Sequence, residues 1–289
     1  MVETAVDGVL VIDKPPGITS HDVVDEVRRR LATKKVGHGG TLDPEATGIL
    51  MVGVGRATRF LEYSQRAPKR YTAVGVFGIT TSTQDASGEI IEVRPAEITR
   101  ADVERVAGGF VGEIDQVPPM VSAVKIGGER LYKKARRGEE VERAARRVTI
   151  HELTVTDFDP DGPRATFDVL CSSGTYVRTL VNDLGEALGC GAHLESLRRV
   201  AAGGFSIDEA IALEEVTPGS LRPLADAVRD LPAIHVTEED AERVGHGRDL
   251  PAVGELEDGA CVAVHLDDRL LAVYRRKGER LVPDRVLGS

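Results

Sequence analysis

The most restrictive feature of this chain is a glycine-rich stretch at residues 36–48, which reads Val-Gly-His-Gly-Gly-Thr-Leu-Asp-Pro-Glu-Ala-Thr-Gly. Its four glycines permit backbone conformations with positive φ. Its proline biases the preceding residue, Asp43, toward an extended conformation. The stretch therefore predicts a shaped loop that presents the Asp43 carboxylate, followed by a buried strand over the apolar residues 49–54. The alternative is a tight turn in which Asp43 only bonds its own backbone.

Strands and helices alternate irregularly along the rest of the chain. This pattern predicts the α+β class with a largely antiparallel central sheet and flanking helices, because a parallel sheet needs regular strand–helix–strand repeats. We expect strands at residues 8–13, 70–78, 148–158 and 164–171. We expect helices capped by Ser20 and by Thr99, at residues 57–64 and 129–137, and one ending near Gly189.

The secondary-structure pattern of the sequence changes near residue 231. An acidic helical pattern at residues 238–244 precedes short strand patterns at residues 260–264 and 270–274. At 289 residues the chain is long enough for roughly two domains. We therefore expect one domain over residues 1–230 and a small β-barrel module over residues 231–289.

The charge distribution is uneven. The formal net charge is −10, which taken alone argues against a nucleic-acid partner. Residues 125–147, however, contain nine basic and four acidic residues, a local charge of +5. A second basic cluster contains Arg56, Arg59, Arg66, Lys69 and Arg70. An electropositive face on an acidic body and ordinary solvated helix faces both remain possible.

The cysteine and histidine patterns give no metal signature. The three cysteines are scattered and form no C-x-x-C pair, so we expect reduced, mostly buried thiols and no metal site. No apolar run reaches the ~18 residues that a membrane-spanning helix needs, and residues 1–4 lack the pattern of a signal peptide. We expect a cytoplasmic protein that does not enter a membrane.

Several motifs, in order, resemble those of one enzyme family. The run at residues 39–44, with Ala46-Thr47-Gly48 after it, resembles the catalytic signature of pseudouridine synthases, specifically the TruB class of tRNA pseudouridine-55 synthases. A proline-rich opening and a Lys-x-Tyr motif resemble other signatures of the class. Further motifs that match are found at residues 13–20, 69–71, 116–125, 171–180 and 194–200.

The resemblance assigns roles to individual residues. It implies that Asp43 is the catalytic carboxylate, that Tyr71 stacks on the target base, and that Arg178 is the charge partner of Asp43. His38 would occupy the space that a flipped base leaves. Without the resemblance, Tyr71 is typical of a core residue and His38 of a turn. The implied substrate- or RNA-binding residues are His38, Gly40, Thr41, Lys14, Lys125, Tyr176 and Leu197.

The resemblance also implies an activity and its partners. The enzyme would isomerise uridine to pseudouridine in the T loop of tRNA, at position 55, by base flipping and without a cofactor. It implies the pseudouridine synthase fold, a PUA-like RNA-binding module at residues 231–289, and an RNA-contacting basic segment around residues 124–147. We expect a monomer with no obligate protein partner.

One residue departs from the family pattern, and rival functions remain. Family members often carry an aromatic residue where this chain has Val121, which places a packing or stacking contact in question. One rival is a non-catalytic protein that binds RNA or assists tRNA folding. Another is a related synthase acting on ribosomal RNA, or a guide-dependent subunit of a ribonucleoprotein.

Overall fold

The protein forms two compact units in the computed structural model, which describes residues 7–122, 125–126, 128–131, 137, 139 and 141–287. The first unit contains residues 1–44, 48–67 and 202–289, and the second contains residues 45–47 and 68–201. Both sides of the predicted boundary at residue 230 therefore belong to the first unit. The boundary itself stays a prediction.

The N-terminal part of the first unit is built on short, apolar strands. β1 (Gly8–Lys14) pairs antiparallel with β3 (Thr47–Val54) and parallel with β14 (Ile211–Ala212). β2 (Val36–His38) pairs antiparallel with β3. Helix α1 (Ser20–Arg30) buries its valines against the leucines of these strands. The strands that flank the glycine-rich loop are thus fixed by a hydrophobic core.

Helix α1 begins one residue earlier than the sequence pattern indicated. Its N-cap is Thr19, whose side chain accepts a hydrogen bond from the amide of Asp22 while the Asp22 carboxylate accepts one from the amide of Thr19. This reciprocal pair satisfies two amides of the first turn. The prediction that Ser20 is the cap was therefore wrong. Ser20 is instead buried beneath the loop.

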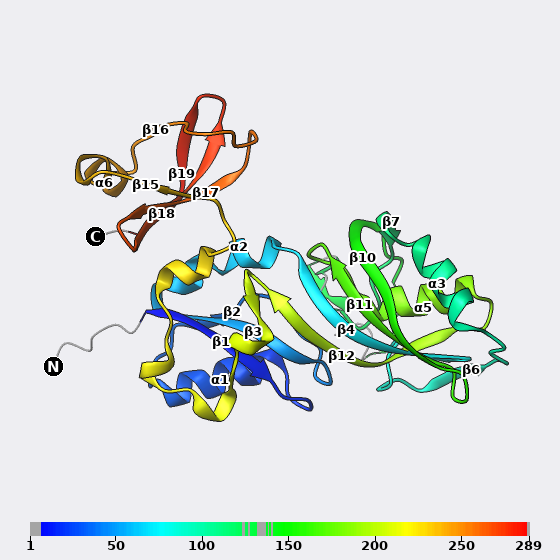
Figure 1. Cartoon of the computed structure of the whole chain (residues 1–289). Coiled ribbons are helices and arrows are strands. Elements are labelled where there is room, and N and C mark those ends of the chain that lie inside the picture. The colour runs from blue at the N-terminus through cyan, green and yellow to red at the C-terminus, as the bar shows by residue number, and fades with distance from the viewer. Residues whose placement is uncertain are drawn as a thin grey trace. The chain divides into compact units, whose positions relative to one another are not determined.

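A five-stranded sheet forms the C-terminal part of the first unit (Figure 1). Its strand order is β15-β17-β18-β19-β16, and helix α6 (Glu238–Gly245) contributes Val244 to its core. The predicted acidic helix and both predicted strands are confirmed. The strands are β15 (Ala233–His235), β16 (Leu250–Pro251), β17 (Cys261–Leu266), β18 (Arg269–Lys277) and β19 (Arg280–Val286).

Two short helices follow β3. The predicted helix at residues 57–64 is a 3-10 helix, η1 (Gly55–Arg59), followed by helix α2 (Leu61–Arg66). Phe60, between them, is buried in a core that also contains residues of β1, β3 and the C-terminal sheet. The remaining short elements of this unit are β13 (Phe205–Ser206), η2 (Ile207–Glu209), η3 (Leu213–Glu215), η4 (Pro218–Ser220) and η5 (Leu224–Val228).

The second unit is a sheet of long strands covered by two helices (Figure 1). Its strands follow the order β12-β4-β11-β10-β7, and β4, β11, β10 and β7 pair antiparallel. Helix α3 (Arg100–Gly108) has the predicted capping box of Thr99 and Asp102. The other elements are β4 (Lys69–Phe77), β7 (Gly112–Gln116), β10 (Arg146–Asp159), β11 (Arg164–Cys171), β12 (Ala192–Ala202) and α5 (Val177–Ala187).

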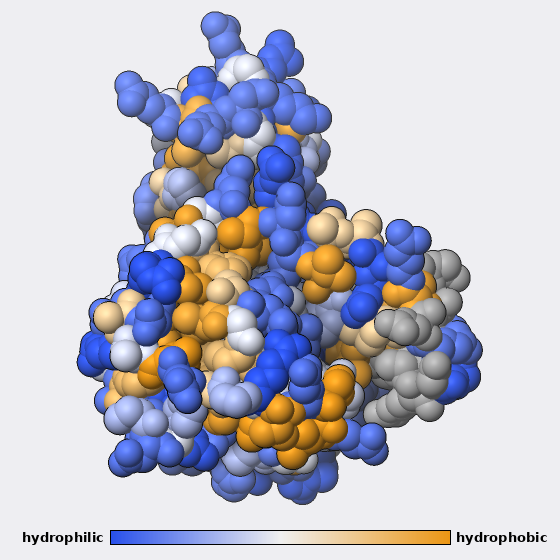
Figure 2. Space-filling model, turned by 90° about the vertical axis from the view of Figure 1, so that its right-hand side faces the viewer, coloured by the Kyte–Doolittle hydropathy of each residue, from blue (hydrophilic) through white to orange (hydrophobic). Residues whose placement is uncertain are grey.

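A hairpin of the second unit exposes hydrophobic side chains. β5 (Ile79–Thr81) and β6 (Ile90–Val93) form a separate two-stranded sheet. Ile90, Ile91 and Val93 are 64%, 68% and 69% exposed. Figure 2 shows that hydrophobic residues gather in patches on the protein surface.

Another hairpin alters a helix prediction. β8 (Lys125–Ile126) pairs with β9 (Glu129–Arg130), so residues 129–130 are extended rather than helical. Residues 132–136 of the helix predicted at residues 129–137 lie outside the described residues, as do residues 124, 127, 138 and 140 of the basic segment around residues 124–147.

The α+β class is confirmed, with mostly antiparallel strands. Cys171 and Cys190 are buried free thiols, as expected, and Cys261 is half-buried. Within the described residues, no helix combines the length and the apolar character needed to cross a membrane.

Candidate active site

The sequence-predicted site residues fall into two groups, one in each unit. The first unit holds Asp43 in an irregular loop between β2 and β3, where its side chain is half-buried. Gly40, in the same loop, has a φ of 119°, a conformation that side-chain-bearing residues rarely adopt. Thr41 is exposed. The predicted loop is therefore confirmed around Asp43, but it is shorter than the glycine-rich stretch, because residues 36–38 form β2 and residues 47–48 begin β3.

Lys14 lies beneath this loop. Its side chain is fully buried, and its ammonium group donates hydrogen bonds of 2.8 Å to the carbonyls of Pro15, Ile18 and Pro44. The amide of Gly17 also donates to the carbonyl of Pro44, over 3.0 Å. The ammonium group therefore bonds the protein's own backbone and holds the residue that follows Asp43. The predicted RNA contact of Lys14 stays a prediction.

Ser20 holds the residue that precedes Asp43. Its hydroxyl accepts a hydrogen bond of 2.9 Å from the amide of Leu42 and donates one of 3.1 Å to the carbonyl of the same residue. Leu42 is itself buried. The backbone is thus bonded on both sides of Asp43, by Ser20 before it and by Lys14 after it. Such support orients a carboxylate without ordering cost at the time of reaction.

His38 ends β2 and is half-buried. Helix α2 lies beside it, since Gln65 Nε2 is 3.4 Å from the carbonyl of His38. A Cβ added at Gly39 would lie 3.0 Å from Ser64 Oγ of the same helix. The close approach of α2 explains why a glycine follows His38.

The second unit holds Arg178 at the start of α5. Its side chain is 4% exposed, and its guanidinium donates to Asp85 Oδ2 over 3.1 Å and to the carbonyl of Val121 over 2.6 Å. The ring of Tyr176 lies 5.8 Å from the guanidinium carbon. A carboxylate partner was expected for a buried arginine, and within this unit Asp85 is one. The pairing of Arg178 with Asp43 stays a prediction.

Sequence reasoning missed Asp85. Its carboxylate accepts hydrogen bonds from Thr83 Oγ1 (2.6 Å), Ser87 Oγ (2.5 Å) and the amide of Ser87 (3.0 Å). Burial raises the pKa of Asp85, but these hydrogen bonds and the charge of Arg178 outweigh it and hold the pKa below its ordinary value. The available signal was the polar Thr-x-Asp-x-Ser spacing at residues 83–87, which is typical of an aspartate that bonds a turn.

The other predicted residues of the second unit are placed as follows. Tyr71 is 8% exposed on β4. Tyr176 is half-buried, and Gln116 bonds both its amide (2.7 Å) and its carbonyl (3.1 Å). Leu197 lies on β12 and is half-buried. Lys125 lies on β8, and its side chain is outside the described part of the chain.

Val121, the departure from the family pattern, contributes its backbone rather than its side chain. Its carbonyl accepts from Arg178, and its side chain is exposed. A backbone acceptor is available whatever side chain the residue carries. The contact to Arg178 therefore does not depend on an aromatic residue at this position.

The second basic cluster predicted from sequence is not one electropositive face. Arg56 pairs with Asp7, Arg66 pairs with Glu62, and Arg70 pairs with Asp168 and Glu152. Lys69 is buried. Because neighbouring carboxylates compensate these arginine charges, they produce little electrostatic potential beyond the protein surface.

A basic groove nevertheless lies beside His38 in the first unit. Its volume is about 800 Å³, and His38 forms part of its wall. Four of its lining residues are basic and only Glu62 is acidic. The basic residues are Lys34, Lys35, Arg59 and Arg285, all exposed. The groove can hold phosphate groups next to the glycine-rich loop.

The role of Lys14 is testable by stability and hydrogen exchange. Replacement by methionine (Lys14→Met) keeps the side-chain length but removes three hydrogen bonds to buried carbonyls, so we expect a loss of about 3 kcal/mol in the free energy of unfolding. We also expect faster amide exchange at residues 42–46. Lys277→Met, at an exposed lysine, is the control and should change neither quantity. Unchanged exchange in Lys14→Met would contradict the role.

The pairing of Asp85 with Arg178 predicts a pH-dependent stability. Asp85→Asn removes a charge beside a buried guanidinium and should cost about 3 kcal/mol at neutral pH. Since the pKa of Asp85 is lowered in the folded protein, its contribution is present above the unfolded value of 3.8 and is lost as the pH falls below it. The difference between wild type and variant should therefore shrink below about pH 4.

Denaturant unfolding from pH 7 to pH 3 measures that difference. Asp168→Asn, which removes a more exposed partner of Arg70, is the matched control and should cost about 0.5 kcal/mol. A loss for Asp85→Asn no larger than for Asp168→Asn, or one independent of pH, would show that Asp85 does not stabilise Arg178 by its charge.

Comparison with known proteins identifies the family. Residues 28–177 match the TruB family pseudouridylate synthase (N terminal domain), and residues 178–226 match the tRNA pseudouridylate synthase B C-terminal domain. A protein of Symbiobacterium thermophilum named tRNA pseudouridine synthase B is 54% identical, covering 84% of this chain and 82% of its own length. A protein of the same name from Streptococcus thermophilus is 43% identical over 98% of this chain and 100% of its own length.

Solved structures agree with this result. The fold is similar to a chain in a crystal structure of a Cbf5-Nop10-Gar1 complex, with a TM-score of 0.79 and 28% identity, over 99% of this chain and 87% of that one. An H/ACA RNP bound to a substrate RNA containing 2'-deoxyuridine gives a TM-score of 0.77 and 26% identity, over 100% and 88% of the two chains. Because the family matches cover most of the sequence and the relatives span nearly all of it, the chain belongs to the TruB family of pseudouridylate synthases.

Proposed function

We propose that this chain isomerises uridine to pseudouridine in the T loop of tRNA, at position 55, with Asp43 as the catalytic carboxylate. The relatives named tRNA pseudouridine synthase B support the coarser statement that the enzyme acts on uridine in tRNA. The observation that supports Asp43 as the catalytic carboxylate is the fixed backbone on both sides of it, bonded by Ser20 and Lys14. The T-loop site rests on the family resemblance.

The reaction explains why one oriented carboxylate is needed. The bond from N1 of the base to C1′ of the ribose breaks, the base turns over, and C5 bonds to the same C1′. The proton on C5 leaves and N1 gains one, so the reaction is an isomerisation without net oxidation. A carboxylate can attack the sugar carbon as a nucleophile or remove a sugar proton as a base. Both routes require Asp43 to be ionised.

The ordinary pKa of an aspartate is about 3.9, and burial in a closed site would raise it. A cation near Asp43 would oppose that rise and keep the carboxylate ionised. The family resemblance assigns this part to Arg178, whose guanidinium Asp85 already orients. Asp85 would then fix the direction of Arg178 and share its charge. Tyr71, also assigned by the resemblance, would stack on the target base and take part in removing the C5 proton.

A uridine inside a folded T loop has to leave its stack to reach a carboxylate. We propose that His38 enters the space that the base leaves, because it lies in the same glycine-rich stretch as Asp43. The basic groove beside His38 would hold the neighbouring phosphates. RNA affinity and catalysis would then depend on adjoining but different residues.

Asp43→Asn tests the catalytic assignment. The amide has the same shape as the carboxylate but neither its charge nor its nucleophilicity, so we expect no detectable pseudouridine and a dissociation constant for tRNA within about twofold of wild type. Pseudouridine mapping on an unmodified tRNA transcript measures the first quantity and filter binding the second. Substrates with altered T loops test the site specificity. Turnover by Asp43→Asn at the wild-type rate would contradict the catalytic assignment and would favour a protein that binds RNA or assists tRNA folding.

The basic groove predicts a salt dependence. Replacing Lys34, Lys35 and Arg59 together by glutamine should weaken tRNA binding and flatten the plot of log affinity against log salt, by up to about 0.9 for each phosphate that is no longer neutralised. Arg105→Gln, at an exposed arginine of α3, should leave the slope unchanged. If the triple variant left the slope of log affinity against log salt unchanged, the RNA phosphates would bind outside this groove.

A further inference from the structure

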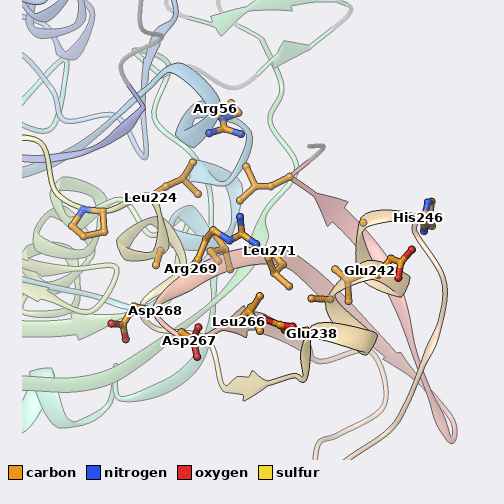
Figure 3. Close-up of a pocket in the computed structure, with 17 residues that line it drawn as sticks. Arg56, Leu224, Glu238, Glu242, His246, Leu266, Asp267, Asp268, Arg269 and Leu271 are labelled. Atoms are coloured by element: carbon orange, nitrogen blue, oxygen red, sulfur yellow. The ribbon is translucent and has the colours of Figure 1, made fainter.

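The C-terminal sheet is poorly suited to holding RNA phosphates over most of its surface. Residues 231–289 contain eight basic and twelve acidic residues, a net charge of −4. A groove of about 1240 Å³, lined by α6, the β17–β18 turn and η5, has four carboxylates against the two guanidinium groups of Arg56 and Arg269 (Figure 3). The carboxylates are those of Glu238, Glu242, Asp267 and Asp268. This charge repels a polyanion and suggests another use for the sheet.

Helix α2 contacts the glycine-rich stretch on one side. Leu61 packs closely on β2 and β3. A Cβ added at Gly53 of β3 would lie 3.1 Å from Leu61, and a Cβ added at Gly37 of β2 would lie 3.7 Å from it. Ser64 approaches Gly39 equally closely, and Gln65 donates to the carbonyl of His38. A shift of α2 therefore moves the backbone around His38, because interiors this densely packed transmit displacement.

The same helix is bonded to the C-terminal sheet on its other side. The hydroxyl of Tyr63 donates to Asp284 Oδ2 of β19 over 2.6 Å. Arg275 pairs with the other carboxylate oxygen over 3.2 Å, and Arg285 pairs with Glu62 over 3.0 Å. Tyr63 is 2% exposed, so its hydrogen bond is made away from bulk water. Charged hydrogen bonds of this kind fix direction as well as distance.

The C-terminal sheet and the strands next to the glycine-rich loop share one hydrophobic core. The cluster that contains Val9 and Met51, from the strands next to the loop, also contains Phe60 and Tyr63 and extends to Ala263 and Val273 of the C-terminal sheet. The sheet is therefore packed against the loop's supporting strands and is not a separately tethered module. Its position and that of α2 are set together.

We infer that the C-terminal sheet positions the loop around His38 through α2, with Tyr63 and Asp284 as positioning residues, an inference that rests on the role proposed for His38. The Tyr63–Asp284 hydrogen bond fixes the position of α2, and α2 fixes the backbone of residues 37–39. Breaking that bond would misplace His38 without removing any group that contacts RNA. The effect should therefore fall on the rate of the bound complex and not on affinity.

Tyr63→Phe tests the inference, since it keeps the ring and removes only the hydroxyl. We expect kcat to fall about fivefold, because small misplacements near reacting groups are costly, while KM stays within about twofold. Asp284→Ala breaks the same bond and also removes the partner of Arg275, so it should lower kcat at least as much. Adding Tyr63→Phe to Asp284→Ala should lower kcat no further.

Tyr274→Phe is the matched control. Tyr274 is fully buried in the same sheet, and its hydroxyl donates to the carbonyl of Arg248 over 2.8 Å without reaching α2. Both phenylalanine variants lose one buried hydrogen bond and should lower the melting temperature similarly. Only Tyr63→Phe should lower kcat. Equal kcat values for the two variants would overturn the inference, and so would a rise in KM alone for Tyr63→Phe.

A second comparison tests the route through His38. In a His38→Ala background, Tyr63→Phe should have no further effect on kcat if it acts through His38. An undiminished fivefold effect there would contradict the inference. Asp43→Asn, measured in parallel, separates this result from the proposed function: an inactive Asp43→Asn beside a normal Tyr63→Phe overturns the positioning role alone, whereas an active Asp43→Asn overturns the catalytic assignment.

Discussion

The contact on which the candidate site depends is a buried ammonium group bonded to three carbonyls. Removing a lysine charge from water is costly unless strong partners replace the water. Lys14 meets this condition because three carbonyl oxygens lie 2.8 Å from its nitrogen. One of them belongs to Pro44, the residue after Asp43, so the charge binds the turn after β1 to the loop that holds Asp43. Ser20 completes the support from the other side.

Features encoded by local sequence were predictable. The glycine-rich loop, the buried strand after it, the strands near residues 148–171, and the acidic helix and two strands of the C-terminal sheet all follow from periodicity and turn residues. The wrong prediction of the N-cap of α1 also has a local cause, because threonine and serine are both favoured N-cap residues and Thr19 and Ser20 are adjacent. The capping box decided between them, since Asp22 lies three residues after Thr19 and not after Ser20.

Features that depend on distant residues were not predictable. Asp85 and Arg178 are 93 residues apart, and Tyr63 and Asp284 are 221 residues apart, so no spacing in the sequence indicates either contact. The burial of Lys14 was not predictable for a different reason. Lysine is almost always exposed, and only the folded chain shows three carbonyls converging on it. The salt bridges of Arg56 and Arg70 were not predictable either, because their carboxylate partners come from other elements.

The central claim is that the Asp43 carboxylate acts on the ribose of a flipped uridine. The most direct measurement is a crystal structure of the Asp43→Asn protein bound to a T-arm RNA that carries the unmodified uridine. The account predicts that this uridine lies outside the loop stack, with its C1′ in contact with the side chain at position 43 and the backbone of residues 42–44 unchanged. A uridine still stacked within the T loop, or one bound with its ribose against a different carboxylate, would contradict it.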